Sequence, residues 1–288
     1  LPADGPAGYG LVSPGKSAEP AKDPSSLDRL FNPATRSEFD VRDLLAGVVD
    51  ADSFDEYKAE YGKTLVCGLC RIGGYPAGIV ASQRQRVQSA KGEIQIGGVI
   101  YHDSADKAAR FVMDCNQTNV PIIFLQDVTG FMVGRDSEQA GIIRSGAKLV
   151  NALSNSVVPK ITVIIGGSFG AGNYALCGKA FDPRFIFAWP GAMYALMGGA
   201  QAATTLVQVQ EQTAKKAGKP LSAAQLADLR KTIQDHYEET MDIRYGAARG
   251  WVDAIIAPSR TRHVLKQALS FVARRHQPSE YRTGVFQV

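Results

Sequence analysis

The chain has 288 residues, 45% hydrophobic and 21% charged, which is typical of a globular protein and long enough for one large domain. Lysine plus arginine exceeds aspartate plus glutamate by 32 to 28, and this small, scattered excess argues against a nucleic-acid-binding protein. We find no signal peptide and no apolar run long enough to span a membrane, so a cytoplasmic protein is expected. Because the chain begins with Leu1, we expect a fragment or a processed form.

The N-terminal residues 1–36 are rich in proline, glycine, alanine and serine and have no apolar periodicity. They are predicted to form a linker that follows another domain, with ordered structure beginning near Asp40. Short helices are expected at Val41–Val49 and Ser53–Tyr61. One domain is then expected over residues 37–288.

Strands and helices alternate along that domain, which predicts an α/β fold. The expected strands are Leu65–Ile72, Ala77–Ala81, Pro121–Gln126, Lys160–Ile165, Arg184–Trp189, Ala192–Leu196 and Val252–Ile256. The expected helices are one capped by Ser104, Ala140–Leu153, a short one ending at Cys177, one opened by Gly198-Gly199, and Arg260–Arg274. A charged helical insertion is expected over residues 211–242, with a capping box at Ser222–Gln225.

Two of the four cysteines, Cys67 and Cys70, have the CxxC spacing of a metal or redox site. They fall within a predicted strand, where residues three apart point to opposite faces. We therefore expect no metal site, and we interpret the cysteines as reduced core residues.

Glycine is concentrated at three turns that each follow a predicted strand. The first, Gly166–Gly172, precedes a short helix, whose free N–H groups could bind an anion or a developing oxyanion. The others are Asp127–Gly134 and Met197–Gly199. Plain structural turns are the alternative, whereas a dinucleotide loop is disfavoured by the glycine spacing and by the lack of an acid near Trp189. Together the turns predict a cavity lined by backbone.

Side chains that could catalyse hydrolysis have no recognisable arrangement. The histidines, His102, His236, His263 and His276, fall in polar loops or charged helices, and no G-x-S-x-G elbow occurs. This pattern favours electrostatic stabilisation by backbone donors over a side-chain acid or base.

Several segments resemble the carboxyltransferase subunits of biotin-dependent acyl-CoA carboxylases. The similarity extends over Asp40–Pro258 and is strongest at Ile122–Gly134, Gly141–Arg144, Gly146–Lys148, Val158–Thr162, Gly170–Tyr174, Ala188–Pro190 and Met197–Gly199. It implies a crotonase (ClpP)-like fold of repeated β-β-α units. It also implies that only the C-terminal, biotin-facing domain of a full subunit is present.

The resemblance further implies that the backbone N–H groups of Ala171 and Gly172 bind the ureido oxygen of biotin. Biotin would arrive on a carrier protein or domain, and a coenzyme A thioester would be the substrate. The expected partners are an N-terminal carboxyltransferase domain, a biotin carrier, and biotin carboxylase or membrane decarboxylase subunits, in a hexameric oligomer. The remaining residues expected to line the site are Thr129, Gly130, Phe131, Gly134, Gly167, Phe169, Gly170, Met197, Gly198 and Gly199.

The acyl group and the direction of transfer stay open. The segments Phe131–Gly134 and Gly170–Tyr174 resemble the methylcrotonoyl-CoA carboxylase branch, but Gly92–Tyr101 and Lys215–Leu221 resemble the glutaconyl-CoA decarboxylase α subunit. A crotonase-like hydratase or hydrolase is an alternative, with Asp127 or Glu138 as its carboxylate. A non-catalytic subunit of such a complex is another.

Overall fold

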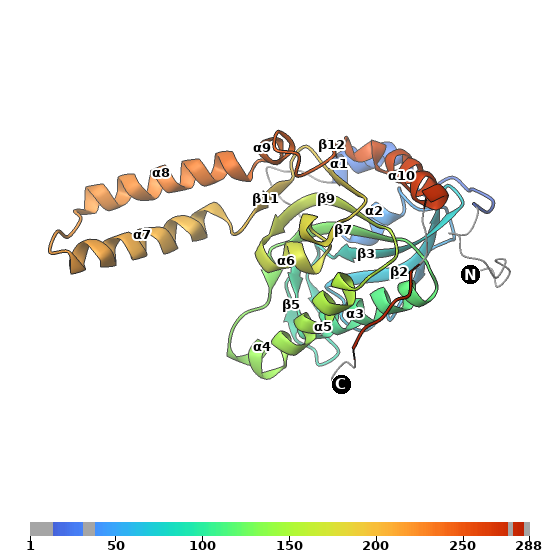
Figure 1. Cartoon of the computed structure of the whole chain (residues 1–288), viewed down its shortest axis with the longest axis horizontal. Coiled ribbons are helices and arrows are strands. Elements are labelled where there is room, and N and C mark those ends of the chain that lie inside the picture. The colour runs from blue at the N-terminus through green and yellow to red at the C-terminus, as the bar shows by residue number, and fades with distance from the viewer. Residues whose placement is uncertain (1–13, 31–37, 276–278, 285–288) are drawn as a thin grey trace.

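The computed structural model describes residues 14–30, 38–275 and 279–284. A mixed sheet forms its centre, in the strand order β1-β2-β3-β7-β9-β10-β12, with β11 also paired to β9 (Figure 1). Strands β1 to β3 pair antiparallel and the others parallel. The strand bounds are Asp55–Glu56 (β1), Leu65–Ile72 (β2), Tyr75–Ser82 (β3), Ile122–Val128 (β7), Lys160–Phe169 (β9), Phe185–Ala188 (β10), Met193–Ala195 (β11) and Ala254–Ile255 (β12).

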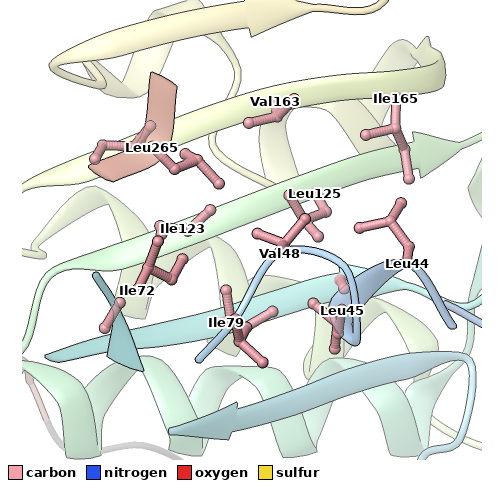
Figure 2. Packing of buried hydrophobic residues seen from close by; sticks show 14 of the residues in the cluster. Leu44, Leu45, Val48, Ile72, Ile79, Ile123, Leu125, Val163, Ile165 and Leu265 are labelled. Carbon is pink, nitrogen blue, oxygen red and sulfur yellow. The ribbon is translucent and has the colours of Figure 1, made fainter. Parts of the chain in front are cut away.

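Helices cover both faces of this sheet. One face carries α3 (His102–Gln117) and α5 (Ile142–Ser154), and the other carries α2 (Val41–Leu45) and α10 (Thr261–Arg275). Figure 2 shows the hydrophobic core on the α2 and α10 side of the sheet. There, aliphatic side chains of β2, β3, β7 and β9 pack against those of α2 and α10. The parallel strands β7 and β9 are buried along their whole length, as strands covered by helices on both faces must be.

The remaining elements are short, apart from one helical hairpin. The hairpin consists of α7 (Gly199–Lys216) and α8 (Ala223–Met241) and projects away from the sheet (Figure 1). The short elements are α1 (Leu27–Leu30), α4 (Arg135–Gln139), α6 (Gly170–Ala175), α9 (Ile243–Ala247), β4 (Val87–Gln88), β5 (Ile94–Gln95), β6 (Val99–Ile100), β8 (Gly130–Phe131) and the 3₁₀ turns Pro24–Ser26, Lys179–Phe181 and Pro258–Arg260. None of the helices in the described ranges is long and apolar enough to cross a membrane.

Most of the predicted elements are confirmed, including the α/β alternation. Residues 211–242 are helical as predicted and contain the end of a long helix, α7, and all of α8, where Ser222 and Gln225 form the predicted capping box. Cys67 and Cys70 are both buried, on opposite faces of β2, as the strand geometry requires. Burial raises the pKa of the Cys67 thiol to about 12, so this cysteine is a protonated core residue.

Three local predictions are wrong. The segment Ser53–Tyr61 is not a helix: Phe54 packs over Gly68, and β1 pairs there with β2 instead. Helix α3 begins at His102, and the Ser104 hydroxyl accepts from the N–H of Tyr101 in its first turn instead of acting as the N-cap. Strand β9 continues through Phe169, because its pairing with β11 holds the glycines extended.

Ordered structure also begins earlier than Asp40. Within the expected linker, residues 14–30 pack on the domain: Leu27 is buried, and the N–H of Lys22 donates to the carbonyl of Ala46 at 2.9 Å. One buried side chain, backbone hydrogen bonds and polar side-chain contacts fix this segment, so no apolar periodicity was needed to order it. The rest of the expected linker lies outside the described residues.

A buried ion pair anchors this segment to the helix that ends the domain. Arg262 of α10 donates to the Asp50 carboxylate at 2.8 Å and to the carbonyls of Val48 at 2.7 Å and Ala18 at 2.6 Å. Asp50 also accepts the N–H groups of the β2–β3 turn. Burial acts to raise the pKa of the Asp50 carboxyl, but these hydrogen bonds outweigh burial and hold the pKa below its ordinary value.

We expect Arg262→Met to lower the free energy of unfolding by about 3–5 kcal/mol, because it leaves a buried carboxylate without its partner. Urea denaturation followed by circular dichroism measures the change. Lys22→Ala is the control, because it removes only the exposed ion pair with Asp43. It should lower the free energy of unfolding by less than about 1 kcal/mol. Equal losses in the two variants would contradict the anchoring role of Arg262.

Candidate functional site

The centre of the candidate site is the irregular pairing between the ends of β7 and β9. Gln126 pairs with Ile164, yet Val128 pairs with Ser168, so one residue of β7 faces three of β9. The extra residues form a bulge that turns the chain from β9 into α6. Bulges of this kind redirect a strand and are frequent next to functional sites.

A buried polar network holds α6 against the sheet. The Ser168 hydroxyl donates to Gln126 Oε1 at 2.6 Å and accepts from Asn173 Nδ2 at 2.7 Å. Gln126 Nε2 in turn donates to the carbonyl of Leu176, just after α6, at 2.6 Å. These side chains are 7% exposed or less, so each hydrogen bond replaces a contact with water that burial has removed. The network therefore fixes the orientation of a six-residue helix that is too short to be stable alone.

The start of α6 has N–H groups directed away from the helix. Phe169 is the N-cap, so Ala171 and Gly172 occupy the second and third helical positions, whose N–H groups have no partner within a helix. Ala171 is exposed and Gly172 is buried. Adjacent donors at a helix start can bind an anionic or partly negative oxygen.

The three glycine turns meet at this helix start. A Cβ on Gly172 would lie 3.1 Å from Cα of Gly130 in the second turn. A Cβ on Gly170, whose φ is +47°, would lie 2.8 Å from the carbonyl oxygen of Leu196, the residue directly before the third turn. The turns approach this closely because glycine has no side chain.

An apolar groove with a volume of about 400 Å³ opens beside the start of α6. Its walls come from β8, the loop after it, α4 and α5. The lining residues are Phe131, Met132, Val133, Glu138, Ile142, Ile143, Gly146, Ala147, Val150 and Ala171. Val133 and Ile143 are 79% and 77% exposed, so this wall is apolar and accessible. No cluster of histidine, cysteine and acidic side chains in the described part of the chain could hold a metal ion.

The predicted site residues fall into three groups. Ala171 and Phe131 line the groove, and Gly170, Gly172 and Gly130 form the backbone contacts beside it. Other residues support the loops: Gly167 donates to Asp127, Phe169 is buried, and the N–H and hydroxyl of Thr129 donate to the carbonyl of Gly98. The rest lie at element boundaries: Gly134 precedes α4, and Met197 and Gly198 precede Gly199 at the start of α7.

Neither the polar network nor the groove wall on α5 was predicted from the sequence. Gln126, Ser168 and Asn173 are far apart in the chain, and nothing local indicates that they interact. The groove wall did leave a signal. Ile143, Ala147 and Val150 recur at helical spacing and form a second apolar face on α5, beyond the face that packs on the sheet. A helix with two apolar faces indicates a second contact.

The alternative assignment of Asp127 as a reacting carboxylate is inconsistent with its position. The side chain is 4% exposed and lies on the sheet face opposite α6, because Gln126 and Val128 on either side of it point toward α6. Its Oδ1 accepts the N–H of Gly167 at 2.8 Å. Glu138, in contrast, is exposed and lines the groove.

The mixed, largely parallel sheet, its helical layers and the glycine-lined helix start define an α/β protein of the crotonase-like class. The β subunit of geranyl-CoA carboxylase from P. aeruginosa has a similar structure, with a TM-score of 0.78 and 33% identity over 96% of this chain and 50% of that one. Transcarboxylase 12S, whose structure is described as a hexamer assembly with methylmalonyl-coenzyme A bound, has a TM-score of 0.79 and 31% identity over the same shares.

Sequence comparison identifies the family. Residues 12–284 match the carboxyl transferase domain, and the chain belongs to that family. It is 42% identical over 263 residues to the methylcrotonoyl-CoA carboxylase beta chain of Dictyostelium discoideum, a match over 91% of this chain and 42% of the relative. It is also 41% identical over 274 residues to the biotin-dependent 3-methylcrotonyl-coenzyme A carboxylase beta1 subunit of Mycobacterium tuberculosis. That match covers 95% of this chain and 49% of the relative. The chain thus spans about half the length of these relatives.

We expect Ser168→Ala to lower the free energy of unfolding by about 1–3 kcal/mol, because Gln126 and Asn173 each lose a buried hydrogen-bonding partner. Thermal and urea denaturation measure the loss. Ser154→Ala, which removes an exposed hydroxyl at the end of α5, is the matched control and should stay within about 0.5 kcal/mol of the wild type. A neutral effect of Ser168→Ala would show that the network does not hold α6.

Proposed function

We propose that this chain is the biotin-facing half of a carboxyltransferase that moves a carboxyl group between carboxybiotin and an acyl-CoA. The observation that carries the proposal is the position of Ala171, which lies both at the N-terminus of α6 and in the wall of the apolar groove. Membership of the carboxyl transferase domain family supports the same activity. The reaction needs a donor for negative charge next to a surface that accepts apolar groups, and this chain has the two side by side.

The N–H groups of Ala171 and Gly172 are proposed to bind the ureido oxygen of biotin. Bound carboxybiotin would supply the carboxyl group, and breaking its N–carboxyl bond would leave negative charge on the ureido oxygen, which preorganised donors stabilise without reorganising. The freed ring nitrogen would then take the α-proton of the acyl-CoA, and the resulting enolate carbon would form the new bond to the carboxyl carbon. The buried network of Gln126, Ser168 and Asn173 keeps the donors in place.

The groove suits biotin and an acyl group because its walls are almost entirely apolar. Phe131, Met132, Ile142 and Val150 would exclude water from the reacting atoms, which strengthens the interaction with the backbone donors. No side chain of this chain is assigned as a base.

The other half of the machinery is proposed to lie outside this chain, which spans about half the length of its curated relatives. We propose that an N-terminal carboxyltransferase domain holds most of the CoA and that biotin arrives on a carrier protein or domain. A biotin carboxylase, or membrane subunits in a decarboxylase, would complete the cycle. The hexamer assembly of the structurally similar transcarboxylase 12S supports a hexameric arrangement here as well.

For the acyl group we propose an uncharged, methylcrotonoyl-like chain instead of a glutaconyl chain. The relatives named above support this choice. Among the described residues that line the groove, Glu138 is the one charged side chain. Its carboxylate would repel the terminal carboxylate of a glutaconyl group, whereas it has no such effect on a branched alkenyl chain.

We expect Ala171→Pro to lower the rate of biotin-dependent carboxyl transfer by about 10²–10³, because it removes one donor from the helix start. Proline is tolerated in the first turn of a helix, so the fold should persist. The rate is measured with the N-terminal half, the biotin carrier and an acyl-CoA present.

Ala224→Pro is the matched control. Ala224 occupies the same second position of α8, is exposed, and lies at the far end of the helical hairpin. This variant should retain the wild-type rate. Transfer that survives Ala171→Pro unchanged would contradict the donor assignment. Turnover of an acyl-CoA that avidin does not inhibit would instead favour the hydratase or hydrolase alternative.

The substrate proposal predicts a higher kcat/KM for methylcrotonoyl-CoA than for glutaconyl-CoA in a panel of acyl-CoAs. Glu138→Gln should narrow the difference by raising kcat/KM for glutaconyl-CoA, because it removes the repelling charge. Glu211→Gln, on the distant hairpin, should leave the ratio unchanged. A wild-type enzyme that prefers glutaconyl-CoA would overturn this assignment while leaving the carboxyl-transfer chemistry intact.

A further inference from the structure

We infer that Asp127 is a positioning residue whose carboxylate shapes the β9 bulge and so sets the direction of the donors at the start of α6. The inference rests on the proposed function, because it assigns those donors a role. Asp127 does not touch the reactants: it is buried on the face of the sheet opposite α6. Its effect passes through the backbone of Gly166 and Gly167.

The bulge closes around the Asp127 side chain. Oδ1 accepts the N–H of Gly167 at 2.8 Å, and a Cβ on Gly166 would lie 2.4 Å from the Asp127 carboxyl carbon. Residue 166 is therefore a glycine because the carboxylate occupies the space of its side chain. Since one residue of β7 faces three of β9 here, the Asp127 side chain fills the gap that regular pairing would close.

The far side of the carboxylate faces an arginine. Arg84 Nε lies 3.5 Å from Oδ2, and both side chains are largely buried. The turn at Gly97-Gly98 packs on the same arginine: a Cβ on Gly98 would lie 3.3 Å from Arg84 Nη1 and 3.0 Å from the carbonyl oxygen of Asp127. The arginine attracts the carboxylate and thus offsets part of the cost of burying its charge.

Two consecutive residues of β7 therefore fix the two ends of α6 from opposite faces. Asp127 holds the chain two residues before the N-cap, Phe169, and Gln126 holds the carbonyl of Leu176 after the last turn. With the end of α6 fixed, the direction of its first N–H groups depends on the bulge. Catalytic donors must be placed to within a fraction of an ångström, and a misplacement of about 1 Å can cost 10²-fold in rate.

The test compares Asp127→Ala with Asp127→Asn in the carboxyl-transfer assay, with the N-terminal half and the biotin carrier present. Alanine removes the acceptor for Gly167, and we expect kcat to fall by on the order of 10²-fold with KM for the acyl-CoA nearly unchanged. Asparagine retains an oxygen at the Oδ1 position and should restore kcat to within about tenfold of the wild type. Hydrogen exchange of the peptide covering residues 166–176 should accelerate in the alanine variant and not in the asparagine variant.

Asp50→Ala is the matched control for a purely structural loss. Asp50 is likewise a buried carboxylate that accepts glycine N–H groups and pairs with an arginine, but it lies at the β2–β3 turn, at the opposite end of the strands. It should lower stability and leave kcat per folded molecule unchanged. Wild-type kcat and exchange in Asp127→Ala, or equal kcat losses in the alanine and asparagine variants, would overturn the inference. An inactive wild-type enzyme would instead refute the proposed function, and the exchange measurement would still test the positioning of α6.

Discussion

The arrangement of the site depends on one constraint: a six-residue helix must be held still at the edge of a sheet. Such a helix has too few internal hydrogen bonds to be stable alone. Side chains of β7 and β9 supply the missing contacts through Gln126 and Ser168 on one face and Asp127 on the other. Because these three side chains are buried, breaking the hydrogen bond of any one of them leaves a buried polar group without a partner. The free-energy cost of that loss keeps α6 in a single orientation.

The same constraint explains where glycine occurs. Gly166 leaves room for the Asp127 carboxylate, and Gly172 allows α6 to rest on the backbone of Gly130. Gly170 adopts a left-handed conformation beside the carbonyl of Leu196. Glycine usually makes a chain flexible. Here each glycine lets two backbone segments, or a backbone and a side chain, come close together, and hydrogen bonds of neighbouring side chains hold them there. The site is therefore rigid although it is rich in glycine.

The groove and the hairpin are two surfaces of different character. The groove presents exposed Val133 and Ile143 beside the backbone donors, an arrangement that suits apolar reactants meeting at a charge-stabilising centre. The hairpin of α7 and α8 buries little beyond its base, at residues such as Ala202, Val207 and Met241. Its outer turns are stabilised by local hydrogen bonds, such as the capping box at Ser222, which need no tertiary contact.

The sequence by itself determined the α/β alternation, the buried strands, the helical character of residues 211–242 and the opposite orientations of Cys67 and Cys70, since apolar periodicity and caps are local properties. The concentration of glycine after predicted strands also located the three turns. Only the tertiary structure decided that β9 continues through its glycines, that residues 14–30 pack on the domain, and that Asp127 faces away from α6. These features depend on pairing between segments far apart in the chain. Strand register and bulges are properties of two strands together, and neither strand encodes them alone.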